Sequence, residues 1–173
     1  MTHHFETEHV LPISIDRVFR FFANPANLPR IMPPSTGVEL LCVKLLPPPG
    51  VSAVSATVAT QESLAGIGSE IIVSVRILPF LPFRMQWIAK ITEFEWNHHF
   101  ADVQKKGPFK SFHHRHELLA ETRNGVNGTV VCDQIDYEVG FGLLGRLAQK
   151  FLISSQLRRT FDYRHLTLEK LLA

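Results

Sequence analysis

The last part of the chain has its hydrophobic residues at the spacing of an α-helix. Between Gly145 and Ala173 there is no glycine or proline, and good helix formers dominate. We therefore expect a helix over Leu143–Leu172, about 45 Å long. Its apolar positions form two stripes: Leu144, Leu147, Ala148 and Phe151, then Leu157, Phe161, Leu168 and Leu172. Ser154 and Ser155 separate the stripes, which predicts a bend or an open face at that point.

Upstream of this helix, the pattern changes to short apolar runs bounded by Gly, Pro, Asn and Ser, which is typical of strands. The expected strands are His3–Leu11, Gly37–Leu46, Ser69–Leu78, Arg84–Glu95, His99–Lys105, Ser111–Glu121 and Thr129–Val139. Two short helices are expected after the first strand, one capped by Ser14 and one beginning at Asn24-Pro25. This order predicts one α+β domain over residues 1–173, with a curved antiparallel sheet of six or seven strands around the long C-terminal helix.

Charge and composition narrow the possible partners. The net charge is +2 and the basic residues are scattered, so we expect no nucleic-acid partner. No apolar run approaches the length of about 18 residues that a membrane span needs, so we expect no stable membrane insertion. The start, MTHHFETEH, is unlike a signal peptide, and Cys42 and Cys132 are expected to be buried thiols. These features predict a cytoplasmic protein, and no motif calls for a cofactor.

The last three strands can be aligned from the turns that join them. A hairpin centred on Gly125-Val126 pairs Arg115 with Asp136 and His113 with Glu138, so this face should be the solvent face. The other face should lie toward the helix, and its pairs are Phe112 with Val139, His114 with Tyr137, His116 with Ile135, and Leu118 with Asp133. Centring the preceding turn on Pro108 places Asp102 beside His114, Phe100 beside His116 and Gln104 beside Phe112. Both alignments place Phe112, His114 and His116 on the same face. This agreement supports them, because a slip of one residue would move every side chain to the other face.

This alignment predicts a polar row, Asp102–His114–Tyr137, on the helix-facing side, with His116 and Asp133 close by. One interpretation is internal hydrogen bonding, which buried polar groups require. A second is hydrogen bonding to a ligand, and a third is acid–base catalysis by His114 and Asp102, with Tyr137 as a donor. His114 and His116 also form an H-x-H pair, a weak metal signal, and we expect no metal there.

The remaining histidine pairs, His3-His4 and His98-His99, lie near strand ends and are expected to be solvated. The segment Leu78–Phe83, LPFLPF, is expected to be a loop packed under the helix, with a ligand portal or a transient membrane or partner contact as the alternative.

Several of these motifs resemble those of one superfamily. They are Gly107-Pro108-Phe109 before the strand with Phe112, His114 and His116, then Gly128-Thr129, Asp133, Tyr137, Phe141-Gly142-Leu143-Leu144-Gly145 and Phe161-Asp162-Tyr163-Arg164. The chain resembles the START/Bet v 1-like superfamily, which has the helix-grip fold, and within it the bacterial SRPBCC proteins of the polyketide cyclase/dehydrase-like type. The resemblance implies an internal cavity for lipids, sterols, polyketides or other apolar molecules.

The function expected from these observations is binding of an apolar or amphipathic small molecule between the sheet and the C-terminal helix. The alternatives are a cyclase- or dehydratase-type enzyme that uses His114 and Asp102, and a regulatory protein-interaction module. An enzyme needs an open cavity that reaches the polar row, whereas an interaction module needs a filled one. The expected ligand-binding residues are Asp102, Gln104, Phe112, His114, His116, Asp133, Tyr137, Trp87, Phe100 and Phe151.

Overall fold

The structure is a computed structural model that describes residues 1–50, 63–76, 83–123, 125–140 and 152–172. Its elements are β1 (Thr2–Leu11), α1 (Ile15–Ala23), η1 (Pro25–Ile31), η2 (Pro34–Thr36), β2 (Glu39–Lys44), β3 (Glu70–Arg76), β4 (Arg84–Glu95), β5 (His99–Lys106), β6 (Ser111–Arg123), β7 (Val126–Glu138) and α3 (Ser154–Leu172). The strands form one antiparallel sheet in the order β1-β7-β6-β5-β4-β3-β2.

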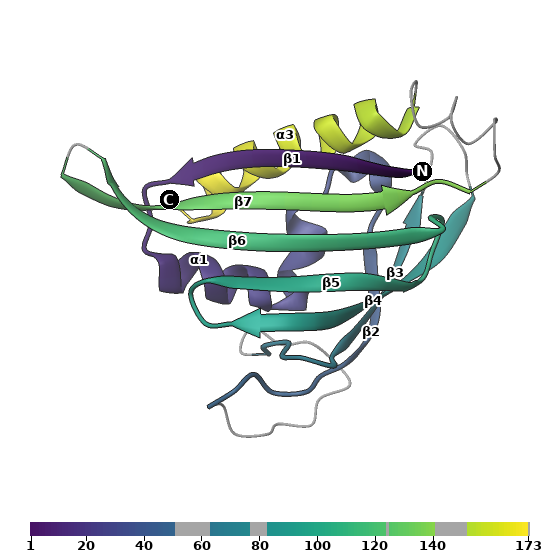
Figure 1. Ribbon diagram of the computed structural model, residues 1–173, viewed down its shortest axis with the longest axis horizontal. Helices are drawn as coiled ribbons and strands as arrows, with labels where there is room; N and C mark the ends of the chain where they lie inside the picture. Colours follow the sequence, from purple (N-terminus) through teal and green to yellow (C-terminus); the bar gives the residue numbers. More distant parts are fainter. Residues whose placement is uncertain (51–62, 77–82, 124, 141–151, 173) are drawn as a thin grey trace.

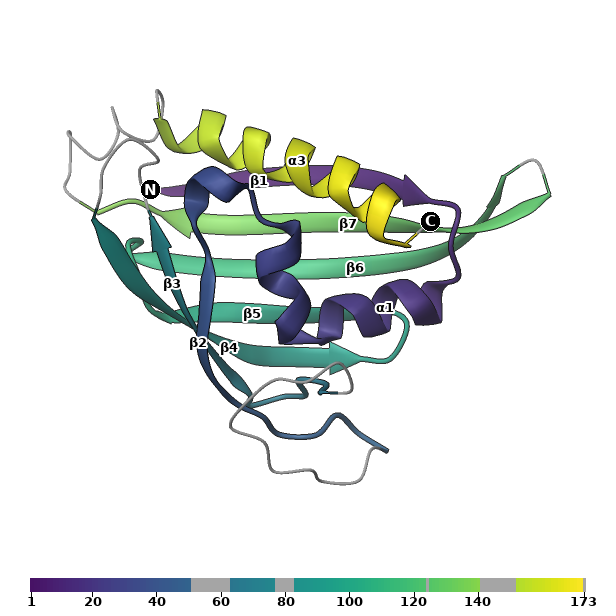
Figure 2. The same ribbon diagram turned by 180° about the vertical axis from the view of Figure 1, so that it is seen from behind.

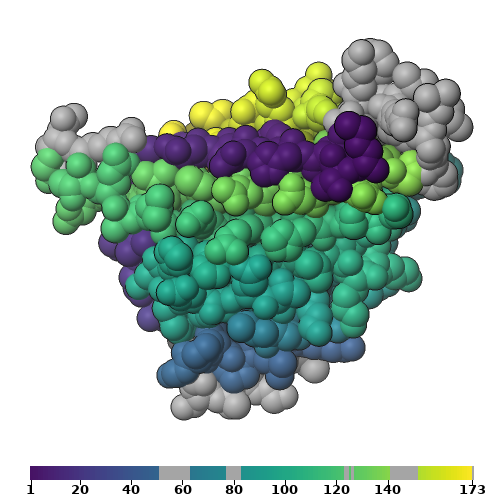
Figure 3. Space-filling model, viewed as in Figure 1, coloured from purple at the N-terminus to yellow at the C-terminus, as the bar shows by residue number. Residues whose placement is uncertain are grey.

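The described helices lie on one side of this curved sheet. Figure 2 shows α3 running along β1 and α1 lying below it on the same face. The opposite face is formed by the strands themselves, with β1, β7, β6 and β5 side by side (Figures 1 and 3). The predicted α+β architecture is therefore confirmed, with seven strands and with two short helices, α1 and the 3₁₀ helix η1, after the first strand.

The first half of the predicted C-terminal helix, before Leu152, lies outside the described residues. The described helix α3 begins at Ser154, directly after two residues with π-type helical structure, Leu152 and Ile153. Ser155 is exposed, and its hydroxyl donates to the backbone oxygen of Leu152 at 3.0 Å. The helical hydrogen bonding thus changes at the serines that interrupt the apolar stripe.

The hairpin between β6 and β7 corrects one predicted register. Arg123 pairs with Val126, and Gly125 has a positive φ of 76°. An Asn-Gly pair favours this short turn, so the hairpin centre lies one residue earlier than predicted. The pairing shifts by two residues, and His114 lies opposite Ile135, whereas Tyr137 lies opposite Phe112.

A shift of two residues leaves every side chain on its predicted face. The register between β5 and β6 is confirmed, because Asp102 pairs with His114 and Phe100 with His116. On the outer face, Arg115 lies opposite Gln134 instead of Asp136, and its guanidinium lies 2.5 Å from a carboxylate oxygen of Glu93.

The start of β7 is held closely against the end of β1. The Thr129 hydroxyl is fully buried and donates to the backbone oxygen of Ile13 at 2.7 Å. A methyl group at the neighbouring Gly128 would lie 2.7 Å from the backbone oxygen of Leu11. This close approach is a physical reason for glycine at this position.

We expect Gly128→Ala to destabilise the protein by about 1–3 kcal/mol, because backbone atoms must shift to accept the methyl group. Gly140→Ala is the matched control, since a methyl group there meets no atom within 4 Å. Urea denaturation of both variants measures the difference. Equal stabilities would show that β1 and β7 are less closely packed than the structure has them.

Candidate functional site

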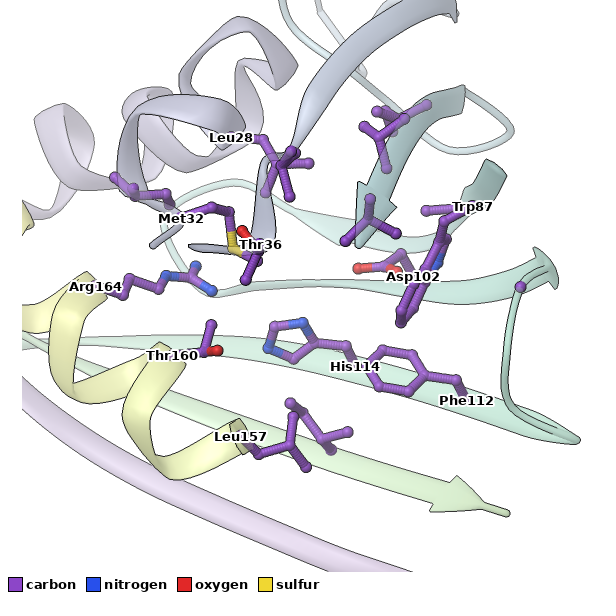
Figure 4. A pocket seen from close by; sticks show the side chains of 18 of the residues that line it. Leu28, Met32, Thr36, Trp87, Asp102, Phe112, His114, Leu157, Thr160 and Arg164 are labelled. Atoms are coloured by element: carbon purple, nitrogen blue, oxygen red, sulfur yellow. The ribbon is translucent and has the colours of Figure 1, made fainter. Parts of the chain in front are cut away.

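A cavity of about 760 Å³ lies between the sheet and the helices α1, η1 and α3. Most of its described lining residues are apolar, and aromatic side chains from β4 and β6 form one wall (Figure 4). The rings of Trp87 and Phe112 meet edge to face with centroids 4.9 Å apart, and Phe109 packs against both. This wall offers flat apolar surface to a bound molecule.

One corner of the cavity is polar. Asp102 from β5, His114 and His116 from β6, and Arg164 from α3 all line it. Figure 4 shows the His114 ring between Asp102 on one side and Thr160 and Arg164 of α3 on the other. The strands produce this grouping because Asp102 and His114 are paired neighbours, and His116 follows two residues later on the same face.

The carboxylate of Asp133, on β7, lies beneath this corner and is only 1% exposed. Its Oδ1 atom lies 3.0 Å from Nε2 of His114 and 2.5 Å from Nδ1 of His116. The Arg164 guanidinium lies 3.8 Å from the same oxygen. One buried carboxylate therefore contacts two histidines of the sheet and the arginine of α3.

The charges of this cluster follow from its burial and its partners. Burial alone favours the uncharged acid, but Arg164, His116 and the hydrogen bonds from both histidines outweigh it and hold the pKa of Asp133 well below its ordinary range. Burial, together with His114 and Arg164, lowers the pKa of His116 to about 3 against the opposing effect of Asp133. The cluster at neutral pH is therefore an ionised Asp133, a charged Arg164 and a neutral His116.

The ionised Asp133 determines which hydrogen atoms its neighbours carry. A carboxylate only accepts hydrogen bonds, so Nε2 of His114 must carry the hydrogen that it donates. In the neutral form of the ring, the other nitrogen, Nδ1, is then an acceptor. Burial raises the pKa of Asp102 above its ordinary value, although His114, His113 and Arg164 oppose this. The corner thus combines the acceptor nitrogen of His114 with the carboxyl group of Asp102, which keeps its proton to a higher pH than usual. Such a pair can hydrogen-bond a ligand or transfer a proton.

Arg164 is the site residue that the sequence reasoning missed. It is 5% exposed, and its guanidinium lies 4.6 Å from the centroid of the Phe22 ring and 5.3 Å from that of Phe161. Its Nε atom has no hydrogen-bond partner among the described residues. The signal for it was its position three residues after Phe161 and four before Leu168, which places it on the buried stripe of the helix.

The predicted site residues fall into three groups. Asp102, Phe112, His114, His116, Trp87 and Phe100 line the cavity. Asp133, Gln104 and Tyr137 are not among the described lining residues. Gln104 instead holds the β5–β6 turn, where its amide nitrogen donates to the backbone oxygen of Phe109 at 2.8 Å, and Tyr137 is 2% exposed beside the Phe109 ring. Phe151 lies outside the described residues.

A curved antiparallel sheet around a C-terminal helix is the helix-grip fold of START/Bet v 1-like proteins. The chain belongs to the family described as polyketide cyclase / dehydrase and lipid transport, whose profile matches residues 11–160. No curated protein sequence matches it significantly.

Solved structures with low sequence identity share the fold over nearly the whole chain. A START superfamily protein from Mycobacterium smegmatis is 12% identical, with a TM-score of 0.64 and coverage of 98% of this chain and 97% of that one. Major latex-like protein 151 from Panax ginseng is 14% identical, with a TM-score of 0.62 and coverage of 99% and 97%. Truncated norcoclaurine synthase from Thalictrum flavum is 13% identical, with a TM-score of 0.60 and coverage of 98% and 95%.

None of the described helices is both long and apolar enough to cross a bilayer.

Because His116 is neutral in the folded protein, the free energy of unfolding should depend on pH. In the folded protein His116 stays unprotonated down to its pKa of about 3, whereas in the unfolded chain it takes up a proton near pH 6.5. The unfolded state therefore binds more protons as the pH falls below 6.5, and stability decreases until about pH 3. Burial lowers the pKa of His9 and His165 as well, which adds to the same trend.

We expect His116→Gln to reduce the slope of unfolding free energy against pH by up to about 1.4 kcal/mol per pH unit in the acidic range. The amide can still donate to Asp133, so the variant should fold. Urea denaturation at several pH values measures the slope, with His113→Gln, on the outer face of the same strand, as the control. A slope unchanged from that of the parent protein would mean that His116 is protonated in the folded state.

Proposed function

We propose that the protein binds a neutral amphipathic small molecule in the cavity, such as a lipid, a polyketide or a similar hydroxyl- or carbonyl-bearing compound. The observation that carries this proposal is an apolar cavity of about 760 Å³ with His114 and Asp102 at one polar corner. Small-molecule sites typically combine this size and apolar lining with a few convergent polar groups.

The aromatic wall favours a rigid, flat apolar body. Trp87, Phe109 and Phe112 contact one another with ring centroids 4.9–5.7 Å apart, so their faces and edges are fixed by mutual packing. Preorganised side chains lose little conformational entropy when a ligand binds. Apolar contact with this wall should supply most of the binding free energy.

The polar corner favours an uncharged head group. The charge of Asp133 is offset by Arg164, which lies 3.8 Å away, so the corner carries no surplus positive charge for an anion. Nδ1 of His114 is an acceptor for a ligand hydroxyl. Asp102, whose pKa burial raises, donates to a ligand carbonyl in its protonated form.

The open cavity also bears on the protein-interaction alternative, which requires a filled interior. Among the described residues the interior holds space for a ligand, and polar groups face that space. Both features support small-molecule binding over a purely structural use of the fold.

Two fluorescent probes, 1-hydroxypyrene and 1-methoxypyrene, test the proposal. Only the first has a hydroxyl hydrogen that it can donate to Nδ1 of His114. We expect the hydroxyl probe to bind about three- to tenfold more tightly, as one hydrogen bond worth about 0.5–1.5 kcal/mol implies. In His114→Gln protein this ratio should fall toward one while both probes still bind. Fluorescence titration gives the four dissociation constants.

The control is His113→Gln, which removes an imidazole from the outer face of the same strand and should leave the ratio unchanged. Equal affinity of the two probes for the parent protein, or a ratio that His114→Gln does not change, would contradict the role given to His114. Failure of both probes to bind would contradict the cavity as a binding site for a flat amphipathic molecule.

A further inference from the structure

The turn between β4 and β5 brings three metal-ligating side chains together, outside the cavity. Glu95 ends β4, His99 begins β5, and His98 lies between them. Figure 2 shows the turn that joins the two strands. Asn97 has a positive φ of 56°, which tightens the turn. The sequence predicts a solvated histidine pair here, but the structure directs both rings toward the same carboxylate.

The three nearest donor atoms form a small triangle. Nδ1 of His98 and Nδ1 of His99 are 3.0 Å apart, and Oε2 of Glu95 lies 3.2 Å from the first and 3.5 Å from the second. A tetrahedral zinc ion with bonds of about 2.0–2.1 Å holds its ligand atoms about 3.3–3.4 Å apart. The triangle therefore already has the dimensions of one face of a zinc coordination tetrahedron.

The other nitrogen of each ring faces a second carboxylate. Nε2 of His99 lies 3.4 Å from Oε2 of Glu93, and Nε2 of His98 lies 3.8 Å from Oε1 of Glu117. The Glu93 carboxylate favours a hydrogen atom on Nε2 of His99, which leaves Nδ1 of His99 with its lone pair, as in metal-bound histidines whose other ring nitrogen donates to a carboxylate. Without a metal ion, Nδ1 of His98 carries a hydrogen atom, because it lies 3.2 Å from the carboxylate oxygen of Glu95 and 3.0 Å from Nδ1 of His99. A metal ion would take the place of that hydrogen atom among the same three donor atoms.

The charge of the surroundings favours a cation. Glu93, Glu95 and Glu117 contribute three carboxylates, and the guanidinium of Arg115 pairs with Glu93. His113 also approaches Glu93, at 3.8 Å. The cavity cluster of Asp102, His114 and His116 is a poorer candidate, because the Arg164 guanidinium lies 3.5 Å from Nδ1 of His116 and repels a second positive charge.

We propose that Glu95, His98 and His99 form a binding site for a divalent transition-metal ion of the zinc type, with two imidazole nitrogens, one carboxylate oxygen and a solvent molecule as ligands. The two nitrogens favour zinc, copper or nickel over magnesium and calcium, which prefer oxygen ligands. The ion fixes the β4–β5 turn, and it also reaches β6 because the backbone oxygen of His98 accepts a hydrogen bond from the Leu118 amide at 2.7 Å.

Isothermal titration of the untagged full chain with zinc chloride tests this site. We expect one equivalent to bind with a Kd on the order of 10 µM, and the unfolding temperature to rise with zinc concentration. Glu95→Gln and His98→Gln should each weaken binding by about tenfold or more. The Glu95 side chain is 65% exposed and the His98 side chain 44% exposed, so both variants should keep the fold.

The matched control is His4→Gln, because His4 is also an exposed histidine, close to Asp136 and Glu6. It should leave zinc binding unchanged. Zinc binding of equal strength in the parent protein and in both turn variants would overturn the site. The absence of saturable binding by the parent protein would also overturn it, and a shared proton would then account for the short distance between the two Nδ1 atoms.

Tryptophan fluorescence provides a second, local readout. The chain has two tryptophans, so Trp87→Phe leaves Trp96, which immediately follows Glu95 in the turn. We expect copper(II) to quench this fluorescence saturably, and the saturable component to disappear when Glu95→Gln is added. Quenching that persists unchanged in the double variant would contradict metal binding at the turn.

Discussion

The ionised carboxylate of Asp133 is the interaction on which the site depends. Burying a charge costs several kcal/mol unless it is paired and hydrogen-bonded, and breaking such a buried pair typically costs about 3–5 kcal/mol. Here the partners come from two elements: His114 and His116 from β6, and Arg164 from α3. Because the charge of Asp133 needs partners from both elements, it holds α3 over the sheet. It also determines how the rings of His114 and His116 face the cavity.

The chemistry of the cavity follows from that constraint. Because Asp133 accepts hydrogen from His114, the ring offers an acceptor on its other nitrogen. Because Arg164 offsets Asp133, the corner is polar without being strongly charged. The aromatic wall supplies apolar surface beside it. These three properties suit a molecule with an apolar body and an uncharged polar end, which is the chemistry proposed for the ligand.

Strong periodicity made much of the fold predictable from the sequence, including the bounds of β4, and the turn centred on Pro108 gave the pairing of Asp102 with His114. The β6–β7 register was misassigned because the hairpin was centred on Gly125-Val126, a choice that charge pairs such as Arg115–Asp136 supported. Exposed ion pairs are worth only about 0–1 kcal/mol, so the turn preferred by Asn-Gly determines the pairing. The error left every side chain on its predicted face, but it changed which residues of β7 lie opposite His114. The role of Arg164 depends on where the helix crosses the sheet, which local patterns do not encode.

The tautomer of His114 tests the central claim most directly. Nitrogen-15 NMR of histidine-labelled protein at neutral pH, with His114→Gln used to assign the signal, distinguishes a protonated ring nitrogen from an unprotonated one. The account predicts a hydrogen on Nε2 and an unprotonated Nδ1, because the ionised Asp133 requires a donor at Nε2. A hydrogen on Nδ1, with Nε2 bare, would show that Asp133 does not orient the ring, and the proposed acceptor for the ligand would be absent.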